Sequence, residues 1–322
     1  MIRSIVAKDA TEFDHIRESA HVAQVYEMIR KNFDTYYDSW INKSEASLPL
    51  KELGEKFRIK PTKRDNKCVL QKLFAAMIED YQSERTKYDK FLDREALQEY
   101  QDDDPTLFKQ NLSKHCPVMY RCVHSHRPEM VEWQMKFKDT PSQDLLDIFV
   151  NLVTFADDYE ENRELTKFKL YDDCKEFGFE PLEEDENYAV QGVIGMGIKS
   201  EVLYHLYPNL FPKRGRLDVY GLYFLSEMKD FGLQGKCSEF LMINDTREVH
   251  SKNYKMDHNY WYPYGLFSLY AIRLTRLIAQ KSKAMGVSLD DNYRFVYAAA
   301  YLAHVCKENS ESMEVMLGGL QD

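Results

Sequence analysis

Residues 20–43 read AHVAQVYEMIRKNFDTYYDSWINK and decide the fold class of this chain. Their large apolar side chains recur at steps of three and four positions, which is the spacing of one face of an α-helix. These apolar positions are Val22, Val25, Ile29, Phe33, Tyr36, Tyr37, Trp40 and Ile41. We therefore predict a long amphipathic helix over 20–43.

The same period recurs along the rest of the chain. It predicts helices over residues 68–82, 128–138, 141–159, 200–206, 216–229, 263–284 and 293–307. The segment 141–159 has little polar face, so we expect its helix to be deeply buried. Only short runs, such as 240–243, have a β-like composition. The sequence thus predicts a mainly α, multi-helix globular protein with at most a minor β element.

Composition and charge limit the classes of function that the chain can have. The 322 residues include only 13 glycines and 10 prolines, and 44% are hydrophobic, which provides ample material for a core and excludes extensive disorder. Lys and Arg number 43 against 53 Asp and Glu, a net charge of −10. Such a charge repels phosphate at long range, so any nucleic-acid site must be local.

The acidic run 102–104 before Pro105 is typical of a stop and a turn. It suggests an N-terminal helical region over 1–105 and a C-terminal helical domain over 106–322, although the length also allows one domain. No stretch resembles a membrane span or a signal peptide. Six scattered cysteines favour free thiols in a reducing compartment, so we expect a cytoplasmic protein without a membrane partner.

Residues 191–220, QGVIGMGIKSEVLYHLYPNLFPKRGRLDVY, carry the main functional signal. Gly195 and Gly197 allow a tight turn whose backbone N–H groups start the next helix, and such a turn can hold a phosphate. Lys213, Arg214 and Arg216 add a basic cluster, which makes this segment locally positive in an acidic chain. We predict that these five residues contact DNA.

The same stretch resembles the helix-hairpin-helix of the DNA glycosylase superfamily, in which a Lys follows the glycine hairpin and an Asp lies further on. Lys199 falls two positions after Gly197, and Asp218 lies 19 positions after Lys199. The resemblance implies that Lys199 attacks C1′ of a damaged nucleotide to form a Schiff base while Asp218 stabilises positive charge on the sugar. Ile194 replaces the family's Pro, and Glu201 replaces a small residue.

These departures leave two other interpretations open. The hairpin would bind DNA without catalysis in the first. In the second, the glycine turn is purely structural, and the chain is a non-enzymatic helical interaction protein or a subunit of an intracellular complex. Neither interpretation requires a cofactor, and none is predicted.

Two further clusters contain side chains of the types that bind metal ions or stack on nucleobases. Cys116, Cys122, His124 and His126 offer zinc donors, but their spacing differs from that of common structural zinc sites, so we predict a loop without metal. The run 254–270 is rich in aromatic residues. Tyr260, Trp261 and Tyr264 would stack on a flipped base, although such a run more often anchors a core helix.

Overall fold

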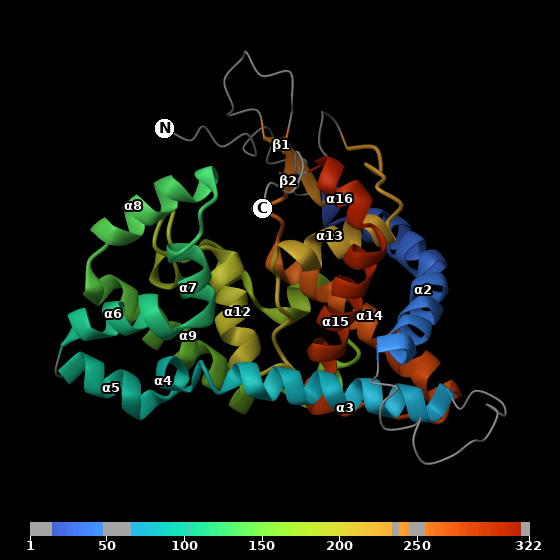
Figure 1. Ribbon diagram of the computed structural model, residues 1–322, viewed down its shortest axis with the longest axis horizontal. Coiled ribbons are helices and arrows are strands. Elements are labelled where there is room, and N and C mark those ends of the chain that lie inside the picture. The colour runs from blue at the N-terminus through green and yellow to red at the C-terminus, as the bar shows by residue number, and fades with distance from the viewer. Residues whose placement is uncertain (1–14, 48–65, 103, 234–237, 245–254, 317–322) are drawn as a thin grey trace. The chain divides into compact units, whose positions relative to one another are not determined.

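The computed structural model describes residues 15–47, 66–102, 104–233, 238–244 and 255–316 (Figure 1). The chain divides into two compact units. The first comprises residues 1–78, 216–262 and 273–322, and the second comprises 79–215 and 263–272. The boundary expected at residue 105 therefore falls inside the second unit.

The described part of the chain is mainly α, as predicted. In the first unit, the helices are α2 (Ser19–Ser47), α13 (Arg216–Leu225), η4 (Asp291–Tyr293), α15 (Arg294–Glu308) and α16 (Ser310–Met316). Strands β1 (Leu241–Asn244) and β2 (Lys255–His258) form an antiparallel pair with Leu241 opposite His258. Helices α3 (Asn66–Arg85) and α14 (Tyr264–Ala284) each contribute residues to both units.

The core of the first unit forms where α2, α13 and α15 pack together. The predicted helix 20–43 is confirmed as α2, and its apolar positions are buried except for Tyr36, which is half-buried. Gly221 lets α13 approach α15 closely, because a Cβ there would lie 2.8 Å from the Cβ of Leu302. His21 of α2 also contacts the buried carboxylate of Glu239, at 2.6 Å.

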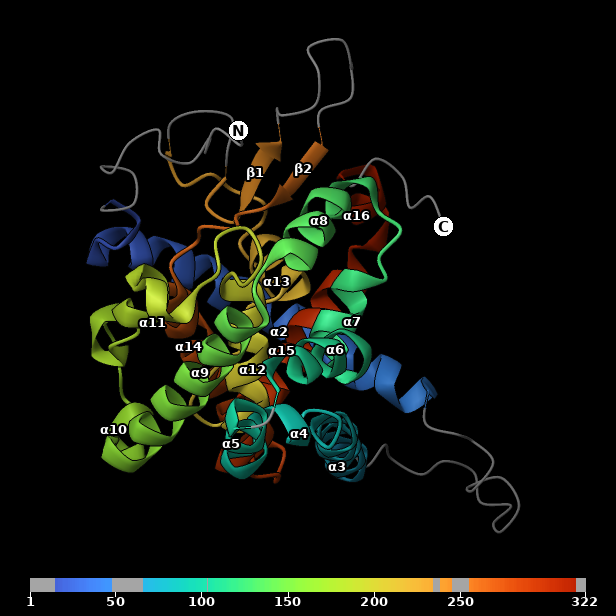
Figure 2. The same ribbon diagram turned by 90° about the vertical axis from the view of Figure 1, so that its left-hand side faces the viewer.

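The second unit is a cluster of mostly short helices (Figure 2). They are α4 (Asp89–Leu92), α5 (Arg94–Asp102), α6 (Pro105–His115), α7 (Pro117–Val123), η1 (Pro128–Met130), α8 (Val131–Asp139), α9 (Ser142–Asn162), α10 (Leu165–Phe168), η2 (Cys174–Phe177), α11 (Glu180–Glu184), η3 (Glu186–Tyr188) and α12 (Met196–Leu206). Helix α9 contacts α4, α5, α6 and α12. Its apolar side chains are buried as its sequence predicted, except for Val150 and Phe155, which are half-buried.

The acidic run before Pro105 separates two of these helices. Helix α5 ends at Asp102, and the carboxylate of Asp104 accepts a hydrogen bond from the amide of Thr106 at 2.8 Å. Pro105 occupies the first position of α6, where a missing N–H costs nothing. Within the described ranges, no helix combines the length and the apolar character needed to cross a bilayer.

Candidate functional site

The tight turn before α12 is made by Gly192 and not by the Gly195–Gly197 pair. The amides of Val193 and Ile194 both donate to the carbonyl of Val190 at 2.9 Å. Gly192 adopts a φ of +77°, which favours glycine, and a Cβ there would lie 2.9 Å from Nζ of Lys136. The backbone thus reverses three residues earlier than the sequence pattern indicated.

Gly195 and Gly197 form the exposed start of α12. Gly195 precedes the helix with extended backbone, and Gly197 is its second residue. A Cβ at either position would meet nothing within 4 Å, and neither glycine adopts a left-handed φ. The amides of Gly195, Met196 and Gly197 donate to no acceptor in the part of the chain that the structure describes. Neither packing nor backbone conformation therefore requires glycine here.

Lys199 is buried on the following turn of α12. Its side chain is 3% exposed, and Nζ donates to the carbonyl of Leu182 in α11. Burial lowers the pKa of Lys199 to about 8, against the opposing effect of Glu183, and the positive charge of Arg214 lowers it further. Lys199 thus holds α11 against α12 through a backbone carbonyl.

Asp218, the other residue that the resemblance assigns to catalysis, belongs to the first unit, whereas Lys199 belongs to the second. It lies in the first turn of α13 and is buried. Burial raises the pKa of the Cys306 thiol, and the charge of Asp218 raises it further. The charge of Asp218 therefore acts on Cys306, which belongs to the same unit.

The three basic residues that were predicted to contact DNA are buried or half-buried. Arg214 is buried, and its amide donates to Oγ of Ser200 at 3.0 Å. Lys213 is half-buried, with Nζ 5.8 Å from the ring centroid of Tyr204. Arg216 is also half-buried and belongs to the first unit. Of the five residues predicted to contact DNA, only Gly195 and Gly197 are exposed.

The aromatic candidates are divided between the units. Tyr260 and Trp261 belong to the first unit and are 51% and 62% exposed. Tyr264 is fully buried in the second unit, where its hydroxyl donates to the carbonyl of Pro212 at 2.9 Å. Its ring stacks on Phe179 at a centroid distance of 5.0 Å. Tyr264 is therefore a core residue, as the alternative interpretation expected.

The cysteine and histidine candidates lie on and beside helix α7, where the sequence predicted a loop. Cys116 is buried before the helix and Cys122 is half-buried near its end. His124 and His126 are exposed, and the ring of His124 stacks on Tyr120 at 4.0 Å. Within the described ranges, these four residues do not meet as a group of metal ligands.

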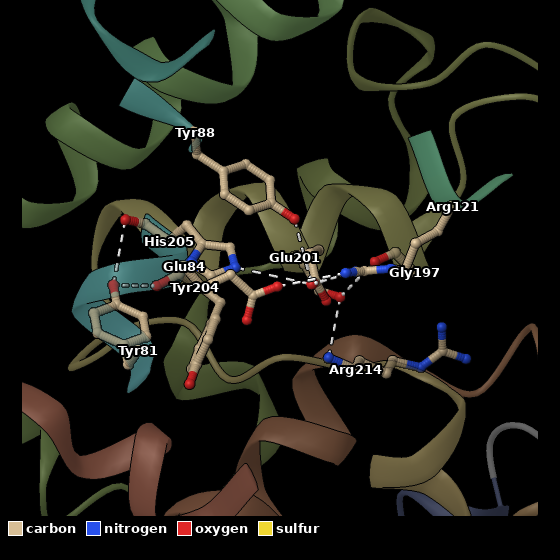
Figure 3. A network of polar contacts seen from close by, with 10 residues as sticks. Tyr81, Glu84, Tyr88, Arg121, Gly197, Glu201, Tyr204, His205 and Arg214 are labelled. Atoms are coloured by element: carbon tan, nitrogen blue, oxygen red, sulfur yellow. Dashed lines mark hydrogen bonds and ion pairs between the residues drawn. The ribbon is translucent and has the colours of Figure 1, made fainter. Parts of the chain in front are cut away.

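A different polar cluster, which the sequence analysis missed, lies inside the second unit (Figure 3). It consists of Glu84 from α3 with Glu201 and His205 from α12, and we call it the Glu–Glu–His cluster. One ligand atom from each of the three side chains lies within 4.8 Å of the others. The spacing of four residues places Glu201 and His205 on one face of a helix. Glu84 precedes Glu201 by 117 positions, so no local pattern reveals it.

Two further side chains hold the carboxylate of Glu201. Nη2 of Arg121 donates to Oε1 of Glu201 at 2.9 Å, and Nη1 donates to Glu84 at 3.4 Å. The hydroxyl of Tyr88 donates to the same Oε1 at 3.4 Å. Burial alone would raise the pKa of Glu201, but the imidazole of His205 and the positive charges of Lys213 and Arg121 lower it to about 2. Glu201 is therefore ionised at neutral pH.

The imidazole of His205 is held by aromatic stacking. Its ring stacks on Tyr88 at a centroid distance of 4.0 Å and on Tyr81 at 5.6 Å. Nε2 lies 3.8 Å from Oε1 of Glu201, and Figure 3 shows this edge of the ring turned toward the carboxylate. The side chain is buried, and neither ring nitrogen has a hydrogen-bond partner among the described residues. A buried imidazole normally satisfies at least one of these nitrogens.

Comparisons with known proteins provide no assignment for either site. No protein-family model matches the sequence, and no match is found among curated proteins or solved structures.

Proposed function

We propose that the chain binds DNA through the exposed start of α12, with the amides of Gly195, Met196 and Gly197 donating to backbone phosphate. One observation carries this proposal: two glycines stand where neither packing nor backbone conformation needs them. A helix start with exposed N–H groups and the positive end of the helix dipole favours an anion. Glycine at these positions keeps the surface open enough for a phosphate to reach the backbone.

Charge on the same unit supports a local site of this kind. Lys213 and Arg214 follow α12 in the chain and bring positive charge to a protein with a net charge of −10. Because both side chains are at least half-buried, they contribute through the local potential more than through direct contact. The proposed interaction is therefore weak at high salt and independent of base sequence.

The double variant Gly195→Ala/Gly197→Ala tests this proposal. Both new methyl groups would project into open space, so the fold is retained while the approach of a phosphate is blocked. Losing a charge-assisted hydrogen bond costs about 1.5–3 kcal/mol, so duplex affinity measured by fluorescence anisotropy should fall roughly 10- to 100-fold.

Gln143→Ala, at the exposed start of α9, is the matched control and should leave the affinity unchanged. Equal affinity of the double variant and the unsubstituted protein would contradict the proposed contact. If the unsubstituted protein binds no duplex, the non-enzymatic interaction protein becomes the better interpretation.

The lowered pKa of Lys199 favours a second candidate function, base excision through a Schiff base. An amine with a pKa of about 8 is partly neutral at physiological pH and therefore nucleophilic. To react, Lys199 has to leave the carbonyl of Leu182. Borohydride should then trap the protein on DNA containing an abasic site. The adduct should be lost in Lys199→Gln and retained in Lys175→Gln, which removes an exposed lysine of the same unit.

A further inference from the structure

We propose that the Glu–Glu–His cluster binds one divalent cation, and that zinc is the ion its donors suit best. This inference is independent of the proposed DNA contact, because it concerns Glu84, Glu201 and His205 alone. One imidazole nitrogen and two carboxylate oxygens are a donor set that zinc accepts. The three ligand atoms already lie within 4.8 Å of one another.

The distances leave only a small movement to complete such a site. Zinc binds imidazole nitrogen and carboxylate oxygen at about 2.0–2.2 Å, which places tetrahedral ligand atoms roughly 3.4 Å apart. Nε2 of His205 and Oε1 of Glu201 are 3.8 Å apart, close to that separation. The side chain of Glu84 is 42% exposed and has room to close the remaining gap.

His205 supplies an observation independent of the two carboxylates. Its imidazole is buried and fixed between Tyr81 and Tyr88, yet neither ring nitrogen has a hydrogen-bond partner in the described part of the chain. Leaving both nitrogens unsatisfied in the interior is unfavourable. Coordination of a cation through Nε2 would satisfy the nitrogen that faces Glu201.

Arg121 explains how the same cluster is stable without a metal ion. Its guanidinium bridges Glu84 and Glu201, so it neutralises the two carboxylates that a cation would otherwise neutralise. The side chain of Arg121 is 55% exposed, which allows it to withdraw into solvent. Arginine and zinc would then compete for the same pair of carboxylates.

Three protein ligands leave one tetrahedral position for water or a substrate atom, which is the arrangement of catalytic zinc. The hydroxyl of Tyr88 donates to Glu201 and would orient this ligand, as outer-shell partners of metal sites do. The cluster therefore fits a reactive zinc site better than a closed structural one.

Zinc titration of the metal-free protein, followed by competition with a chromophoric chelator, tests this inference. We expect the unsubstituted protein to bind one zinc ion per chain. The Glu84→Gln variant should bind it at least tenfold more weakly, and the His205→Gln variant should not bind it. Glu84 is partly exposed, so its variant should fold even if the His205 variant does not. Glu79→Gln, an exposed glutamate on the same helix α3, should bind zinc as the unsubstituted protein does.

Arg121→Gln distinguishes competition with zinc from a purely structural role of the ion pair, which would leave zinc affinity unchanged. Removing the competing guanidinium should lower the melting temperature of the metal-free protein, and zinc should restore it with at least tenfold higher affinity than before. X-ray absorption should show nitrogen and oxygen neighbours at about 2.0–2.2 Å. The inference is overturned if no zinc binds, if Glu84→Gln has no effect, or if sulfur neighbours show that cysteines hold the metal.

Discussion

Replacing Lys199 with methionine should remove a defined part of the pH dependence of stability. Burial lowers the pKa of Lys199 from 10.5 to about 8 in the folded protein. Between these values the unfolded chain binds more protons than the folded one, so the free energy of unfolding rises with pH. The difference between the two pKa values corresponds to about 3 kcal/mol. Below pH 8 the full cost of burying the charged lysine is present, and above pH 10.5 it is gone.

The methionine variant lacks this cost at every pH, but it also leaves the carbonyl of Leu182 without its donor. That loss costs about 1–3 kcal/mol and does not vary with pH. The stability of the unsubstituted protein minus that of Lys199→Met should therefore rise by about 3 kcal/mol between pH 7 and pH 11. Groups that titrate equally in both proteins cancel in this difference.

Urea denaturation followed by circular dichroism at a series of pH values measures the difference directly. Lys175→Met serves as the control, because Lys175 is exposed and its substitution should give a flat difference across the same range. A flat difference for Lys199→Met as well would refute the reasoning. It would mean that the amine of Lys199 is protonated as readily in the folded protein as in the unfolded chain.

Three further substitutions test the packing. Gly221→Ala should destabilise the first unit by about 1–3 kcal/mol, because the new Cβ would lie 2.8 Å from the Cβ and 2.9 Å from the backbone oxygen of Leu302; an unchanged melting temperature would contradict this close approach. Gly197→Ala should stabilise the protein by about 0.4–1 kcal/mol in chemical denaturation, and a loss of stability would show that this position does need glycine. Glu239→Ala should lower the free energy of unfolding by about 3–5 kcal/mol, because the buried carboxylate contacts His21 at 2.6 Å and accepts a hydrogen bond from Tyr262 at 2.5 Å. A loss of less than about 1 kcal/mol in calorimetry would argue against this network.

The long helices were predictable because their apolar residues sustain one period over many positions. Helix α2 extends the predicted segment by only a few residues, and α15 runs from Arg294 to Glu308 where 293–307 was predicted. Short helices such as α7 and α11 contain too few residues to establish a period. In α11, Leu182 is the buried residue in a segment of five residues that is otherwise mostly acidic.

The candidate sites were less predictable from the sequence than the helices were. The sequence located a glycine-rich start of a helix, but it assigned the turn to Gly195 and Gly197 because spacing cannot reveal the left-handed φ of Gly192. The burial of Lys199 depends on α11, whose carbonyl at Leu182 accepts a hydrogen bond from Nζ. The partners of Glu201 lie 117 positions earlier, at Glu84, and 80 positions earlier, at Arg121. Such contacts are set by tertiary packing, which no local motif encodes.

The packing of α2 against α15 also sets an order of events during synthesis. About 250 residues separate the end of α2 from the start of α15, and the hydroxyl of Tyr301 donates to the carbonyl of Phe33 across that interval. At ribosomal rates of about 5–20 residues per second, α2 waits roughly 13–50 s for this partner. The second unit draws most of its core from the continuous stretch 79–215 and can assemble meanwhile. Helix α2 is thus within reach of chaperones and proteases for this interval, before its contact with α15 can form.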